Sequence, residues 1–145
     1  KYNVILLSTV SVDGNAEIFE DIYHREIIIS CKLGERNYWH DIRFEIKKQL
    51  VHFPNVSFDW IEGREVYFNS LKKTLIAVGA PGYGQYSAVH QFAFRTGTLL
   101  FTYDSFNDIK FLPHIDLKDG EDFVSFNLFN LNLEGESCVL NILFG

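Results

Sequence analysis

The chain has 145 residues and a formal net charge of −6, and 47% of its residues are hydrophobic. This length suits one core, so we expect a single globular domain over residues 1–145. The composition excludes a disordered or fibrous chain, and the longest uncharged apolar run, Thr74 to Pro81, is too short to span a membrane. Because phosphate backbones are bound by clustered basic residues, and the 13 basic residues here are scattered, we predict no nucleic-acid and no membrane partner.

Most of the chain divides into short apolar or alternating segments separated by turn signals, a pattern typical of β-strands. Asp13-Gly14, Asp119-Gly120 and residues 95–98 are predicted turns, the last closing a hairpin. The predicted strands are residues 2–12, 17–22, 25–33, 56–61, 65–69, 75–78, 88–94, 99–103, 123–133 and 138–144.

One helix is predicted, over residues 37–51. Asn37 can cap its start, and Pro54 favours extended geometry at the residue before it, which ends the helix. An alternating strand through Ile42, Phe44 and Ile46 is the alternative. One face of the predicted helix carries Trp39, Ile42, Ile46 and Leu50.

These elements predict a mainly β protein. Strands alternate with turns rather than with helices, so we expect an antiparallel β-sandwich or flattened barrel with the 37–51 helix packed on it. For the same reason a parallel α/β sheet is disfavoured.

No motif for catalysis, metal or cofactor binding is recognisable, and we predict a protein that is not an enzyme and has no cofactor and no metal. Gly79, Gly82 and Gly84 occur in the order G-x-x-G-x-G, which is not a phosphate-binding order, and the segment after them alternates like a strand. We interpret this loop as a flexible connection between strands, or as a mobile loop that borders a ligand cavity or a partner surface. A strand would place Ser87 and His90 on opposite faces, which argues against a catalytic pair.

The two cysteines, Cys31 and Cys138, are predicted to be buried, inert thiols; a disulfide between them would require export. We expect a cytoplasmic protein, with export as the alternative. Trp60 is expected to pack beside Phe58, although Trp39 and Trp60 also suit a sugar-stacking platform.

Acidic residues in predicted turns and edges are the candidate binding site. Such a negative surface steers and docks a basic partner. We therefore hypothesise a small acidic inhibitor of the bacterial toxin-immunity kind, which neutralises a basic toxin, such as a nuclease, by covering its active site. The candidate residues are Glu17, Glu20, Asp21, Asp116, Asp119, Glu121, Asp122, Glu134 and Glu136.

Two other functions remain open from the sequence. The many Phe residues suit a barrel or sandwich that binds a small apolar ligand. An exported carbohydrate-binding or adhesin-like module is the other alternative, and it predicts an exposed Trp and a Cys31–Cys138 disulfide.

Overall fold

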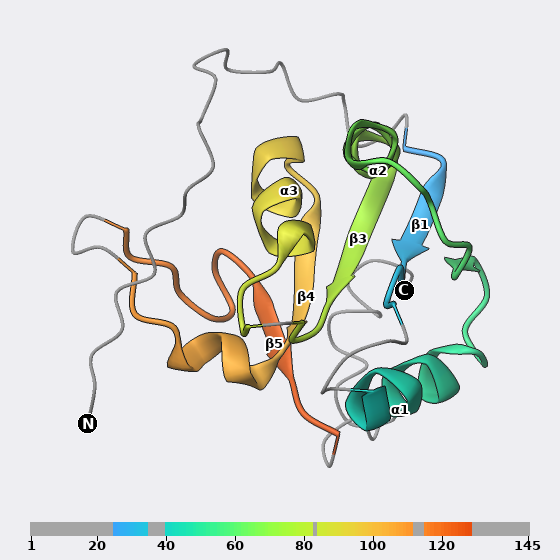
Figure 1. Ribbon diagram of the computed structural model, residues 1–145. Helices are drawn as coiled ribbons and strands as arrows, with labels where there is room; N and C mark the ends of the chain where they lie inside the picture. The colour runs from blue at the N-terminus through green and yellow to red at the C-terminus, as the bar shows by residue number, and fades with distance from the viewer. Residues whose placement is uncertain (1–24, 35–39, 83, 112–114, 129–145) are drawn as a thin grey trace.

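A computed structural model describes residues 25–34, 40–82, 84–111 and 115–128 (Figure 1). These residues build a five-stranded sheet of order β2-β1-β3-β4-β5, in which every neighbouring pair is parallel. The strands are β1 (Ile27–Ser30), β2 (Val56–Ser57), β3 (Thr74–Gly79), β4 (Leu99–Tyr103) and β5 (Val124–Phe126).

Helices connect these parallel strands, as they must when each strand has to return to the same end of the sheet. The α-helices in the described part of the chain are α1 (His40–Leu50), α2 (Arg64–Lys72) and α3 (Ala88–Thr96). A short 3₁₀-helix, η2 (Asp104–Asp108), follows β4. This architecture is that of a doubly wound, flavodoxin-like α/β fold.

The core has two layers because side chains alternate along the strands. Ile76 and Val78 of β3 pack with Ile46 and Leu50 of α1 on one face of the sheet. The intervening residue, Ala77, packs in a second cluster that includes residues of α2 and α3. These two helices lie on the other face of the sheet (Figure 1). Helices thus cover both faces of β3, and its residues 76–79 are all buried.

The predicted β-sandwich or barrel is wrong, and so is the argument against a parallel sheet. Residues 65–69 and 88–94, taken as strands, lie in α2 and α3. The buried residues of α3 include Val89, Phe92, Ala93 and Thr96, which share one face at the spacing of a helix; His90 and Gln91 are buried beside them. Once these segments are helices, their flanking strands are joined by crossovers and pair in parallel.

The predicted hairpin at residues 95–98 is also wrong. Gly97 has φ 62°, in the left-handed region that favours glycine, and ends α3. The amide of Thr98 donates to the Ala93 carbonyl at 3.0 Å, which satisfies an acceptor at the helix end. The chain then enters β4, parallel to β3.

Several predicted elements are confirmed. The helix predicted at 37–51 is confirmed as α1 over its described residues, with Ile46 and Leu50 buried, whereas Asn37 and Trp39 lie outside the described residues. The strands predicted at 75–78 and 99–103 are β3 and β4. Predicted strands 25–33, 56–61 and 123–133 shorten to β1, β2 and β5 over their described residues, and those at 2–12, 17–22 and 138–144 lie outside the described residues.

Candidate functional site

The strand order reverses between β1 and β3. From β1 the chain crosses to β2 on one side, then returns past β1 to form β3, β4 and β5 on the other. The connections that leave the carboxyl ends of β1 and β3 therefore diverge to opposite faces of the sheet. In open α/β sheets, ligands bind in the crevice that such a switch point creates.

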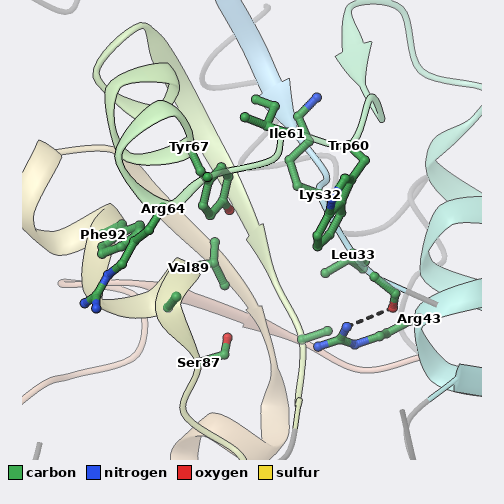
Figure 2. Close-up of a pocket in the computed structure, with 14 residues that line it drawn as sticks. Lys32, Leu33, Arg43, Trp60, Ile61, Arg64, Tyr67, Ser87, Val89 and Phe92 are labelled. Carbon is green, nitrogen blue, oxygen red and sulfur yellow. Dashed lines mark hydrogen bonds between the residues drawn. The ribbon is translucent and has the colours of Figure 1, made fainter. Parts of the chain in front are cut away.

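A pocket of about 430 Å³ lies at this position, within the usual size range of small-molecule sites. Leu33 and Gly34 after β1 and Ala80 after β3 form its floor. Figure 2 shows the side chains of the β2–α2 loop, α1, α2 and α3 around it. Among the described residues that line it, none is Asp or Glu, whereas Lys32, Arg43 and Arg64 are cationic. We call it the switch-point pocket.

Arg43 of α1 ties the two strand ends together. Its Nε donates to the Pro81 carbonyl at 2.8 Å. Its Nη1 donates to the Gly34 carbonyl at 2.8 Å, the bond drawn in Figure 2. Burial lowers the pKa of Arg43, although a guanidinium keeps its proton in proteins. Within the described residues both partners of Arg43 are neutral carbonyls, so its half-buried positive charge is not balanced by a carboxylate.

The first turns of two helices also face the switch-point pocket. Gly63 and Arg64 begin α2, while Ser87, Ala88 and Val89 begin α3. Because glycine stands at the N-cap of α2, that cap has no side chain to bond the amides of the first turn. Helix N-termini carry partial positive charge, so both add to the field of the arginines.

Aromatic side chains form the other part of the wall. Trp60 is 66% exposed, so the prediction that it packs beside Phe58 is wrong. Its ring lies against Gly34, where an added Cβ would sit 3.5 Å from the ring. Across the pocket, Tyr67 and Phe92 belong to α2 and α3, and the Arg64 guanidinium lies over the Phe92 ring, 5.3 Å from its centre (Figure 2).

Lys32 lies at the rim. Its Nζ donates to the Ser57 hydroxyl at the end of β2. Burial lowers the pKa of Lys32, and nearby Asp59 acts in the opposite direction. This cation is therefore partly balanced, unlike Arg43.

Beneath the pocket, His90 holds the start of α3. Because the Ser87 amide can only donate, at 3.0 Å, His90 Nδ1 is an acceptor and the proton sits on Nε2, which donates to the Thr102 hydroxyl at 2.8 Å. The Ser87 hydroxyl lies 2.9 Å from Nδ1. Burial lowers the pKa of His90 to about 4, and the charge of Arg43 acts in the same direction, so His90 is neutral at pH 7.

Two sequence predictions about this segment are wrong. Ser87 and His90 are not on opposite faces of a strand; they are hydrogen-bonded neighbours in the first turn of α3. The glycine loop from Gly79 does not lead into a strand but opens a helix, and Ala80 within it lines the pocket. The alternative interpretation, a loop that borders a ligand cavity, fits this position.

Of the nine acidic candidates, the structure brings four together in the loop before β5 and leaves the rest undescribed. Asp119 accepts bonds from the Ser125 amide at 2.9 Å and from its hydroxyl, and Asn107 Nδ2 donates to it at 3.3 Å. Burial raises the pKa of Asp119, but these bonds together outweigh it and lower the pKa. Asp116, Glu121 and Asp122 are exposed; Glu17, Glu20, Asp21, Glu134 and Glu136 lie outside the described residues.

Asp119 therefore has a structural role in this loop, which the charge pattern did not reveal. The acidic inhibitor and its basic toxin partner stay a prediction. The apolar-ligand and carbohydrate-binding alternatives also stay predictions, apart from their sandwich or barrel scaffold.

Other sequence predictions concern cysteine, metal and membrane chemistry. Cys31 is fully buried, as predicted, and burial raises the pKa of its thiol to about 12; Cys138 lies outside the described residues. Over the described ranges, no group of three or more His, Cys, Asp or Glu side chains is placed to hold a metal ion. In the same part of the chain no helix is both long and apolar enough to cross a membrane.

Sequence reasoning missed the switch-point pocket because its residues come from separate segments with no common spacing. Comparisons of the chain with protein-family models, curated proteins and solved structures give no match.

Proposed function

We propose that this protein binds a small phosphate-bearing molecule in the switch-point pocket. The observation that carries the proposal is Arg43, a half-buried cation whose described partners are the carbonyls of Gly34 and Pro81. A buried charge without a counter-charge is costly, so a site of this kind suits an anionic ligand.

The surroundings of Arg43 support the same ligand chemistry. Arg64 supplies a second cation from the first turn of α2, and the N-termini of α2 and α3 both face the pocket. Helix N-termini and guanidinium groups are the usual binding groups for phosphate. A carboxylate in the lining would oppose such a ligand, and none occurs among the described lining residues.

The pocket lining is positively charged although the chain as a whole is negatively charged. The protein carries a formal net charge of −6, yet the pocket gathers Lys32, Arg43 and Arg64. A cleft lined by one sign of charge raises the local concentration of an oppositely charged ligand. The net charge describes the whole surface, whereas these cations define one concave site.

Calorimetric titration with inorganic pyrophosphate tests the proposal. Wild-type protein should bind in a saturable way, and Arg64→Gln should weaken binding by about tenfold, the scale of one charge-assisted hydrogen bond. Arg95→Gln is the matched control, because Arg95 also lies over a ring, that of Phe68, but at the opposite end of α3 and outside the pocket lining.

Arg43 requires a milder change because it also bridges two loops. Arg43→Lys keeps the charge but not the fork that reaches both carbonyls, so binding should weaken while the protein stays folded. If wild-type protein shows no saturable binding, or if the Arg64 and Arg95 variants bind equally, the proposal is wrong.

A further inference from the structure

We infer that the phosphate-bearing ligand is a nucleoside phosphate whose base stacks on Trp60. This inference rests on the proposed function and adds the chemical class of the ligand. It comes from the aromatic part of the switch-point pocket, whereas the proposed function comes from its cations.

Trp60 is placed as a stacking platform. It is the most exposed of the large hydrophobic side chains in the described residues, at 66%, although it lines a pocket. The edge of its ring lies against Gly34, where an added Cβ would be in ordinary contact with the ring at 3.5 Å. A planar heteroaromatic group is the ligand chemistry that such a supported and exposed indole fits best.

Tyr67 supplies a directional contact opposite Trp60. Its ring is largely buried against Phe92, with ring centres 6.0 Å apart, while its hydroxyl faces into the pocket (Figure 2). No hydrogen bond joins this hydroxyl to another described residue. Burial raises the pKa of Tyr67 well above its usual value, so the hydroxyl stays protonated and can donate to a ligand oxygen or ring nitrogen.

The rest of the lining favours a base, rather than a second sugar rich in hydroxyl groups, as the group that contacts the aromatic wall. Sugar hydroxyls need many acceptors, which carboxylate and amide side chains usually supply. Among the described lining residues there is no Asp, Glu, Asn or Gln. Ile61, Leu33 and Val89 instead present apolar surface, which suits the faces of a base.

The number of cations indicates more than one anionic group on the ligand. Arg43 and Arg64 lie on different helices, α1 and α2, and neither is paired with a carboxylate among the described residues. Both arginines line the same pocket as the first turns of α2 and α3, so a ligand with two phosphate groups offers an anion to more than one of these groups. Nucleoside diphosphates are therefore the appropriate probes, with pyrophosphate as the probe that lacks the base.

The test compares ADP, UDP and pyrophosphate by calorimetry on wild-type, Trp60→Ala and Trp60→Phe proteins. At least one nucleoside diphosphate should bind wild-type protein about tenfold more tightly than pyrophosphate, the scale of one base–aromatic contact. Trp60→Ala should remove this difference without changing pyrophosphate affinity, and Trp60→Phe should keep most of it. Because Trp60 is exposed, neither change should disturb folding.

The outcomes separate this inference from the proposed function. If pyrophosphate binds as tightly as both nucleoside diphosphates, or if Trp60→Ala keeps the difference, the nucleoside is wrong while a phosphate site stands. If none of the three probes binds wild-type protein, both proposals are wrong.

Discussion

Replacing Gly79 with alanine should destabilise the protein by about 1–3 kcal/mol. Gly79 ends β3, directly below the hydrogen bond between His90 and Thr102. A Cβ added there would lie 2.7 Å from Thr102 Oγ1, 3.1 Å from Thr102 Cβ and 3.0 Å from His90 Nε2. All of these atoms are buried and belong to the elements that hold α3 on the sheet, so they have little room to move.

The magnitude follows from two costs. Overpacking a core typically costs about 1–3 kcal/mol. If Thr102 instead moves away, the Nε2 proton of His90 loses its acceptor in the core, which costs about 1–3 kcal/mol. The two costs are linked, because relief of the clash breaks the hydrogen bond.

Urea unfolding measures the effect, and the same loop provides a control. Gly84 has no heavy atom within 4 Å of an added Cβ, so Gly84→Ala should change the unfolding free energy by less than about 0.5 kcal/mol. In a Thr102→Ala background, Gly79→Ala should cost less than in wild type, because the closest atom is gone. A Gly79→Ala protein as stable as wild type would refute the predicted packing around His90.

Two further predictions concern stability. Burial lowers the pKa of His90 from 6.5 to about 4, so between these pH values the unfolded chain binds a proton that the folded chain excludes. The free energy of unfolding should therefore be highest above pH 6.5 and should fall by about 3 kcal/mol as the pH falls toward 4, as measured by urea unfolding. His90→Gln should lack this pH dependence. A His90→Gln protein with the pH profile of wild type would contradict the prediction. Gly97 has a φ of 62°, so Gly97→Ala should lower the thermal midpoint and destabilise the protein by about 1 kcal/mol, and Gly97→Asn should destabilise it less. Equal stability of the wild-type, Gly97→Ala and Gly97→Asn proteins would contradict the left-handed helix end.

The sequence predicted α1 and β3, although a strand through Ile42, Phe44 and Ile46 was the alternative to α1. In α1, Ile46 and Leu50 are both buried and charged residues surround them, so the helical period stands out. β3 is buried on both faces, and its sequence is a short, nearly continuous apolar run, as is typical of a strand in a parallel sheet.

The helices α2 and α3 were missed because their aromatic residues imitate strands. Val66 is 60% exposed although it is apolar, which hides the helical face of α2 that Tyr67 and Leu71 form. In α3, Phe92 and Phe94 alternate as in a strand, yet only Phe92 is fully buried. Without these two crossovers the remaining strands could be joined only by hairpins, so an antiparallel fold was the consequence.

The candidate site depended on that topology. Lys32, Arg43 and Arg64 are far apart in the sequence and were taken as scattered charges. They line one pocket because β1 and β3 are neighbours with the same direction, and because α1 and α2 both begin beside the crevice. Spacing along the chain carries no signal for such a site, whereas strand order does.

Calorimetric titration of the wild-type, Arg64→Gln and Arg95→Gln proteins with pyrophosphate tests the switch-point pocket most directly. Saturable binding to wild-type protein is expected, with about tenfold weaker binding to Arg64→Gln and wild-type affinity for Arg95→Gln. The absence of binding to wild-type protein, or an equal loss in both variants, would contradict a phosphate site between β1 and β3.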